Sequence, residues 1–278
     1  MDVGSRLRYA RKSSGVSRAN LAERSGISEA TIARIEGGAV SPRVDTLERL
    51  LRICGQRLEV LPDLAEGIDR AQIREGLVRT PTGRAVTAAN VHRQLAAVRA
   101  AAFRPAGVGR TGVSEGAPPQ FDPETLLDLL EHGGVRFIVI GGFALNLYGS
   151  PRATGDLDIC YERSDENIER LATVLTRAEA KLVNAPPDLD LPIDARRLSM
   201  GLNFTFLTVF GRFDCLGEAD GVGGYEELAR TAVQMEIFGA QVPVASIESL
   251  QRMKIAAGRP KDLIDLGYIQ AIEDPSGS

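Results

Sequence analysis

Residues 137–159 read FIVIGGFALNLYGSPRATGDLDI, and the interpretation of the whole chain starts from this stretch. Its first four residues are apolar and three of them are β-branched, which predicts a buried strand that ends at two glycines. Gly141 and Gly142 carry no Cβ, so a phosphate chain could approach their backbone closely. Residues 144–148 then predict a short helix, whose N-terminal N–H groups and dipole favour an anion.

Two acids follow in the next predicted strand. Asp156 and Asp158 are separated by one residue, so their side chains project from the same face of a strand. Carboxylates held side by side repel each other unless a divalent cation lies between them. Asp214, in a later predicted strand, has Phe213 and Cys215 facing the other way and could share that face. Three such carboxylates would hold two Mg²⁺ ions, whereas the alternative is a surface acid on an edge strand.

A glycine pair, a short helix and an Asp-x-Asp strand together resemble the polymerase-beta-like nucleotidyltransferase superfamily. The residue pattern Gly-Gly-x-Ala-Leu, with Arg152, Thr154 and Asp-Leu-Asp, is most similar to the bacterial abortive-infection (AbiEii-type) toxin branch of this superfamily. The resemblance implies that the three aspartates are catalytic and bind metal, with a nucleoside triphosphate as substrate. It also implies that the two glycines and Arg152 bind the nucleotide. A plain strand, turn and helix with surface acids is the alternative.

A second motif lies near the C-terminus. Residues 253–266 read MKIAAGRPKDLIDL and place three cations in an otherwise acidic region. Cations there could neutralise a triphosphate. This residue pattern is similar to the C-terminal motif of the same toxin-related family. The resemblance implies that Lys254 touches the nucleotide and that Asp262 supports the site. Arg259 and Asp265 are second choices, and a solvent-exposed pair of helices is the alternative.

The front of the chain predicts four helices between residues 5 and 61. Expected helices at 4–14, 18–25, 29–36 and 44–54 are punctuated by capping serines, a glycine turn at Gly26 and two glycines after residue 36. The pattern LAERSGIS, TIARIEGG and a proline at 42 resembles the Cro/C1-type (XRE) helix-turn-helix family. Such domains usually bind DNA as dimers, so we expect a homodimer on palindromic operator DNA.

The family resemblance implies two sets of DNA contacts, one to base edges and one to phosphates. Base edges are expected to meet Glu29, Ala30 and Arg34, and phosphates to meet Arg18, Ser28 and Arg43. Glu29 is negatively charged and therefore departs from an ideal phosphate-facing surface, although a carboxylate can accept a hydrogen bond from cytosine N4. A helical protein-interaction module of the same shape is the alternative.

Composition separates two halves of the 278-residue chain. Residues 1–120 carry 19 Lys and Arg against 12 Asp and Glu, a balance of +7, while residues 121–278 carry 14 against 25, a balance of −11. The basic half suits nucleic acid, and the acidic half suits a site that collects Mg²⁺. Three widely spaced cysteines suit neither a disulfide framework nor a zinc cluster. Neither histidine, at 92 and 132, has partner ligands at metal spacing, so both are taken as ordinary.

These observations predict an α+β protein of two domains. Residues 1–61 are expected to form an all-α helix-turn-helix bundle, and residues 121–278 a nucleotidyltransferase domain with a mixed sheet flanked by helices. Residues 62–120 are expected to be a connector with two helices, at 68–78 and 86–103, and a flexible linker from 104 to 120. No apolar run is long enough to span a membrane and no signal core appears, so we expect a cytoplasmic protein.

The expected activity is transfer of a nucleoside monophosphate from a nucleoside triphosphate to an RNA or protein acceptor, with tRNA as one candidate. Fusion to a DNA-binding domain leaves open whether the chain is a toxin, an antitoxin or a self-repressing hybrid. A regulator whose nucleotidyltransferase-like domain senses a nucleotide or binds a partner without turnover is the second hypothesis.

Overall fold

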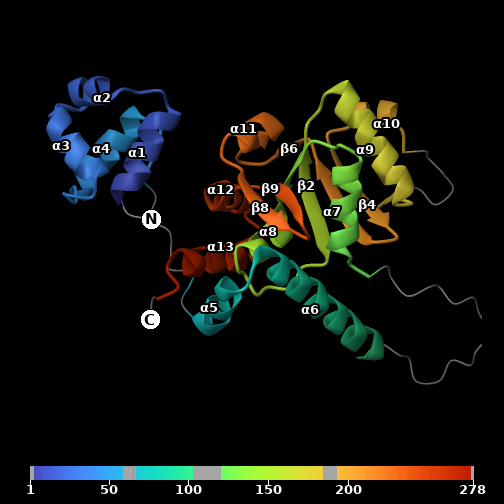
Figure 1. The fold of residues 1–278 in the computed structure, drawn as a ribbon. Coiled ribbons are helices and arrows are strands. Elements are labelled where there is room, and N and C mark those ends of the chain that lie inside the picture. The colour runs from blue at the N-terminus through green and yellow to red at the C-terminus, as the bar shows by residue number, and fades with distance from the viewer. Residues whose placement is uncertain (1–2, 59–64, 66, 103–119, 184–192, 277–278) are drawn as a thin grey trace, which may run out of the picture. The chain divides into compact units, whose positions relative to one another are not determined.

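The computed structural model describes residues 3–58, 65, 67–102, 120–183 and 193–276. Within it the chain divides into two compact units, Met1–Asp63 and Leu64–Ser278. Among the described residues no helix is both long and apolar enough to cross a membrane. Figure 1 draws both units as ribbons.

The N-terminal unit is a bundle of four helices around one apolar core. Ser17 and Ser28 cap α2 and α3 by accepting from Asn20 N and Thr31 N, as the sequence predicts, and Gly26 ends α2 in the left-handed conformation. Leu7, Leu21 and other apolar side chains of all four helices are buried together. The helices are α1 (Val3–Ser13), α2 (Arg18–Ser25), α3 (Glu29–Glu36) and α4 (Val44–Ile53).

The second unit is built on a mixed sheet of seven strands in the order β3-β4-β5-β2-β1-β9-β8. β2 pairs antiparallel with β1 and parallel with β5, so it lies at the centre (Figure 1). All four residues of β1 are buried, as the unbroken apolar run predicts. The strands are β1 (Phe137–Ile140), β2 (Asp156–Tyr161), β3 (Lys181–Leu182), β4 (Asn203–Thr208), β5 (Gly211–Leu216), β8 (Val233–Ile237) and β9 (Ala240–Val244), with a separate hairpin of β6 (Glu218–Ala219) and β7 (Gly223–Gly224).

Helices flank this sheet, which confirms the predicted fold class. The amphipathic α9 places Leu171 and Leu175 in the core, and α7 packs against it. Cys160 and Cys215 are buried free thiols within the same core, and Cys54 is a buried free thiol in the first unit. The helices are α7 (Pro123–His132), α8 (Gly141–Leu147), α9 (Asp165–Arg177), α10 (Ala195–Met200), α11 (Tyr225–Ala229), α12 (Ile247–Ala257) and α13 (Pro260–Glu273).

The two helices expected in a connector pack instead on the second unit. α5 (Arg70–Val78) buries Ile73 against Ala271 and Ile272 of α13, and α6 (Pro81–Ala102) lies against α8 and β8. α6 begins at Pro81, within the predicted break, because proline suits the first turn of a helix. Residues 103–119, almost all of the predicted linker, lie outside the described residues. The compact second unit therefore includes residues well before position 121.

Candidate active site and DNA-binding surface

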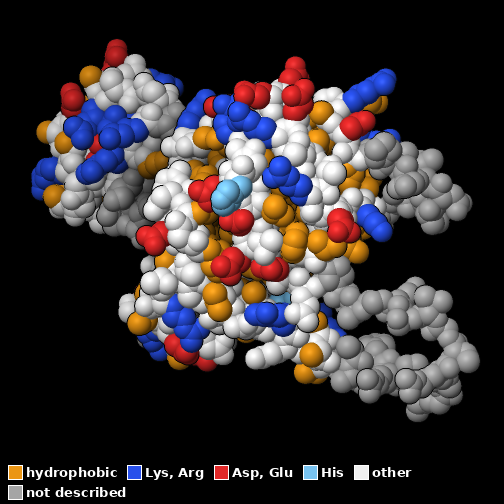
Figure 2. Space-filling model, turned by 45° about the vertical axis from the view of Figure 1, so that its right-hand side comes forward, with side chains coloured by type: hydrophobic (Ala, Val, Ile, Leu, Met, Phe, Trp, Pro, Cys, Tyr) orange, Lys and Arg blue, Asp and Glu red, His pale blue; other side chains and the backbone are white. Residues whose placement is uncertain are grey.

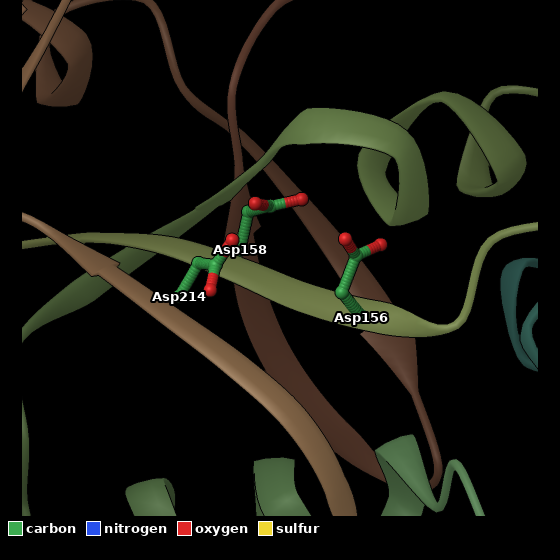
Figure 3. A group of neighbouring side chains, drawn as sticks. All are labelled: Asp156, Asp158 and Asp214. Atoms are coloured by element: carbon green, nitrogen blue, oxygen red, sulfur yellow. The ribbon is translucent and has the colours of Figure 1, made fainter. Parts of the chain in front are cut away.

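Three aspartates converge on one face of the central strands. Asp156 and Asp158 belong to β2, and Asp214 lies directly opposite Asp158 in the parallel register of β5. One carboxylate oxygen from each can be chosen so that all three lie within 4.8 Å of one another. Figure 3 shows the three side chains rising from the two strands toward a common space. The three carboxylates therefore share one face of β2 and β5, as strand alternation predicts.

Gly141 allows the corner between β1 and α8 to approach these acids. Its φ is +72°, and a Cβ built there would lie 2.0 Å from Oδ2 of Asp158. At Gly142 a Cβ would lie 2.8 Å from Oγ1 of Thr154, and the Gly142 N–H donates to the Asp158 carboxylate. The positions of the two missing Cβ atoms are thus taken by the side chains of Asp158 and Thr154, while both glycines still line the cleft, and their contact with phosphates stays a prediction.

Burial and mutual repulsion disfavour the charged forms of these acids. Burial, with repulsion from Asp156 and Asp214, raises the pKa of Asp158 to about 7 against the opposing effects of Lys254 and the Gly142 N–H. Burial also raises the pKa of Asp214, which hydrogen bonding from Thr205 and the charge of Arg212 partly oppose. A cation placed among the carboxylates would remove this penalty.

The donor set fits a hard divalent cation. All three ligands are carboxylates, the oxygen donors that Mg²⁺ prefers. Oδ1 of Asp214 is buried without a hydrogen-bond partner, and the Nε of Arg212 lies 3.5 Å from it. Oδ1 of Asp156 instead accepts from the Thr154 hydroxyl at 2.7 Å, which fixes the orientation of that carboxylate. These three side chains could therefore hold a metal ion.

The acids line a cleft of about 720 Å³. That volume falls in the range of small-molecule and cofactor sites. Its walls carry six basic side chains and four acids, the three converging aspartates and Asp220, and both predicted glycines line it. The basic residues are Arg99, Arg152, Arg212, Lys254, Arg259 and Lys261.

Two buried aspartates hold three of these cations in place. Nζ of Lys254 lies 3.2 Å from Oδ1 of Asp262 and 2.7 Å from Oδ2 of Asp265, and both aspartate side chains are fully buried. Arg152 forms a two-pronged ion pair with Asp265, and Nε of Arg259 lies 2.6 Å from Oδ2 of Asp262. Three positive charges against two negative charges leave the group with a net charge of +1.

The nucleotide-binding residues expected from the C-terminal motif therefore fall into two sets. Lys254 and Arg259 line the cleft, as does Arg152, while Asp262 and Asp265 are not among the lining residues. Asp262, grouped with the nucleotide-binding residues and expected to support the site, thus lies behind the cleft, where its contacts orient cations. Because both aspartates accept from more than one cation, they preorganise the positive wall.

α6 supplies a wall of the cleft that the sequence motifs do not reveal. His92, Leu95, Ala96 and Arg99 of this helix line the cleft. His92 is half-buried, and burial lowers its pKa, although the charge of Asp156 opposes that shift. Its ring sits edge-on to Phe121, 6.0 Å between centroids. The available signal was the spacing of these residues, three and four positions apart on a helix.

Five of the six residues expected to contact DNA are exposed on the N-terminal unit. Ser28, Glu29, Ala30 and Arg34 lie along α3 or at its N-terminus, and Arg43 precedes α4. Figure 2 shows Lys and Arg side chains grouped on the visible face of this unit. Basic side chains gathered on one surface are typical of a nucleic-acid interface.

Arg18 has a partner within the protein. Its Nε lies 2.8 Å from Oε2 of Glu36, and Arg11 Nε lies 2.6 Å from Oε1 of the same fully buried carboxylate. Burial by itself raises the pKa of Glu36, but hydrogen bonds and charges from the two arginines outweigh it and leave the pKa below its ordinary value. Arg18 therefore helps to join α2 to α3, a role beyond the phosphate contact expected from the sequence.

Comparison with solved structures returns nucleotidyltransferases at low similarity. The lincosamide antibiotic adenylyltransferase LnuA, bound to lincomycin, is 16% identical, with a TM-score of 0.38 over 53% of this chain and 94% of that one. A candidate nucleotidyltransferase from Thermotoga maritima is 16% identical, with a TM-score of 0.35 over 51% and 86%. The antibiotic-resistance factor ANT(2'')-Ia is 15% identical, with a TM-score of 0.36 over 53% and 80%. Scores this low say nothing about activity.

Comparison with protein families is more informative. No curated protein matches the chain. Residues 2–64 match a helix-turn-helix domain, which covers the four-helix unit. Residues 126–277, more than half of the chain, match the nucleotidyl transferase AbiEii toxin of type IV toxin-antitoxin systems. The chain therefore carries a helix-turn-helix domain and belongs to the AbiEii family of nucleotidyl transferase toxins.

Proposed function

We propose that the second unit transfers a nucleoside monophosphate from a nucleoside triphosphate to an acceptor hydroxyl. In this reaction the acceptor oxygen forms a bond to the α-phosphorus, and the bond to the leaving pyrophosphate breaks. The convergence of Asp156, Asp158 and Asp214 at the floor of a cation-walled cleft is the observation that carries the proposal.

The three aspartates would bind two Mg²⁺ ions, which when bound neutralise charge on the attacking and leaving oxygens. Thr154 orients Asp156, and the Gly142 N–H orients Asp158. Asp214, whose Oδ1 has no hydrogen-bond partner, would complete the metal site and help to remove the proton of the acceptor hydroxyl. Each acid thus has a distinct environment in the cleft.

Lys254, Arg152 and Arg259 would hold the triphosphate. The buried aspartates behind them keep these cations in position before a ligand arrives, so little side-chain entropy is lost on binding. Gly141 and Gly142 would form the corner on which the phosphates rest, with Asp158 already occupying part of that space.

We further propose that the N-terminal unit binds operator DNA as a homodimer and represses the chain's own transcription. Arg34, Glu29 and Ala30 would contact base edges. Ser28, Arg43 and Arg18 would contact the DNA phosphates and so position the domain on the duplex. The acceptor would be an RNA, such as tRNA, or a protein, in a toxin-antitoxin setting in the cytoplasm. The exposed α3 face beside a basic surface supports this part of the proposal.

Incorporation of label tests the transferase. Purified protein is incubated with each α-labelled nucleoside triphosphate, Mg²⁺, and either total tRNA or a cell lysate. We expect label in one of the two acceptors, and we expect its loss in Asp158→Ala and on addition of a chelator. Asp128→Ala, on the exposed face of α7, is the matched control and should retain incorporation.

The second candidate is a transcriptional regulator whose nucleotidyltransferase-like unit binds a nucleotide or a partner without turnover. The fused helix-turn-helix domain favours it. The same incubation, combined with a separate measurement of operator binding, distinguishes the two functions. Operator binding with no incorporation into either acceptor supports the regulator and rejects the transferase.

A further inference from the structure

The cleft needs a surface for the nucleoside part of its ligand in addition to its metal and phosphate groups. The three aspartates occupy the floor, and the cations of α12, α13 and the loop before β2 occupy one wall. A nucleobase is planar and apolar on both faces, so it is held by ring and aliphatic side chains rather than by carboxylates. Aliphatic side chains of several elements line the cleft, among them Leu216 of β5 and Met253 of α12, and α6 adds both aliphatic side chains and a ring.

Four residues of α6 form one continuous strip along the cleft. His92, Leu95, Ala96 and Arg99 are spaced at i, i+3, i+4 and i+7, so they share one face of the helix, and all four line the cleft. His92 contributes the one aromatic ring among the described lining residues. Leu95 is 42% exposed although it lies in a cleft, which leaves apolar surface available for a ligand.

The strip is held firmly against the catalytic strand. A Cβ built on Gly155, the residue before Asp156, would lie 2.0 Å from Cε1 of His92, so only glycine allows this approach. The His92 ring is also fixed edge-on by the buried Phe121. A ring held in this way loses little freedom when a ligand contacts it.

The α6 strip lies outside the part of the chain that defines the family. The family match begins at residue 126, whereas α6 ends at Ala102. The family assignment therefore gives these residues no role. The packing of α6 on α8 and β8 nevertheless brings them to the cleft.

We infer that the strip formed by His92, Leu95, Ala96 and Arg99 is the nucleoside-binding wall of the cleft. It contacts the base of the nucleoside triphosphate while the cations of α12, α13 and the loop before β2 hold its phosphates. This assignment rests on the proposed function, because it takes a nucleoside triphosphate to be the ligand.

Inorganic triphosphate is the probe that separates the two walls, since it has the phosphates and lacks the base. Binding of ATP, GTP, CTP, UTP and inorganic triphosphate to the full chain is measured by calorimetry with Mg²⁺ and without acceptor. The wild-type protein should bind at least one nucleotide more tightly than inorganic triphosphate. His92→Ala should weaken that nucleotide about 5- to 150-fold and leave inorganic triphosphate unchanged.

Further variants keep the test independent of folding. Leu95→Ser alters an exposed side chain and should also weaken only the nucleotide. Val98→Ser, at a position on α6 that is 65% exposed and does not line the cleft, is the matched control and should change neither ligand. Lys261→Ala, which removes an exposed cation of α13 that lines the cleft, should weaken both ligands.

The outcomes distinguish this inference from the function beneath it. If His92→Ala and Leu95→Ser weaken both ligands equally, or leave the nucleotide unaffected, the nucleoside wall is overturned while the phosphate site stands. A wild-type protein that binds inorganic triphosphate as tightly as every nucleotide also overturns the nucleoside wall alone. A wild-type protein that binds none of the five ligands overturns the proposed function as well.

Discussion

Gly141 combines two constraints at one backbone position. Its φ of +72° is a conformation that side chains with a Cβ rarely adopt, and the position where a Cβ would stand is taken by the Asp158 carboxylate. Substitution should therefore strain the backbone and displace a proposed metal ligand together. The two effects can be separated because other glycines share only the first constraint.

We predict that Gly141→Ala abolishes incorporation and lowers the free energy of unfolding by more than about 1 kcal/mol. The matched control is Gly239→Ala, between β8 and β9, where φ is +84° and nothing lies within 4 Å of an added Cβ. It should lose about 1 kcal/mol and keep its activity. Urea unfolding and labelled-nucleotide incorporation are the measurements, and equal activity of the two variants would contradict the steric argument.

Arg34 tests the assignment of α3 to the major groove. It is exposed on the last turn of α3, so Arg34→Ala should not disturb folding. We predict that it relaxes preference at one operator base pair, at a cost of about 1–3 kcal/mol for the preferred base. Affinities for the operator and its single-base variants are measured at fixed salt. Arg52→Ala, on α4 and paired with Glu48, should leave the preference intact, and an unchanged profile for Arg34→Ala would reject the groove assignment.

At the scale of helices and strands, the predictable features are those set by neighbours in the chain. The boundaries of α2 and α3 follow from capping serines and glycine stops, each of which acts within one turn. The shared face of Asp156 and Asp158 follows from strand alternation alone. The same rule predicts that Asp214 can share this face. Its position opposite Asp158 depends on the register of β5 on β2, which the sequence does not specify.

What the sequence does not reveal is packing between distant elements. α6 lines the cleft because His92 meets Gly155 across more than 60 residues of chain, and no local pattern encodes that contact. Its residues are rich in alanine and show little helical amphipathicity, so the helix resembles a connector. The same limit applies to Glu36, whose two arginine partners come from other helices.

Glu36 joins three helices of the first unit and should make their stability depend on pH. Because its folded pKa lies below the unfolded value near 4.5, its contribution is present above pH 4.5 and is lost as pH falls through the folded value. Glu36→Gln would leave the buried Arg11 uncompensated, so we predict a loss of about 3 kcal/mol at pH 7 and a weaker acid dependence. Glu48→Gln, in an exposed pair with Arg52, should cost less than about 1 kcal/mol.

Urea unfolding of the full chain at pH 7 and pH 4, followed by helical circular dichroism and operator binding, makes the Glu36 comparison. Equal losses in the two Gln variants, or an unchanged pH dependence in Glu36→Gln, would show that the buried ion pair does not hold the three helices together.

At the scale of the whole molecule, the boundary between the two units decides which fragments should work. Ile73 of α5 is fully buried against Ala271 and Ile272 of α13, and Ala85 and Ala89 of α6 belong to the main core of the second unit. A fragment beginning at residue 121 would expose these apolar surfaces and lose one wall of the cleft. A fragment beginning at residue 64 keeps both.

We therefore predict that fragment 64–278 unfolds cooperatively and retains incorporation, whereas fragment 121–278 is less stable by several kcal/mol and inactive. Removal of buried side chains costs about 1.5–3 kcal/mol each, so losing Ile73 together with the α6 contacts is enough to give that difference. Fragment 1–63 should bind operator DNA, more weakly if dimerisation needs the second unit. Thermal unfolding and incorporation are compared at equal concentration. Equal stability and activity of the two longer fragments would show that α5 and α6 are attachments to the catalytic unit, and that its cleft is complete without them.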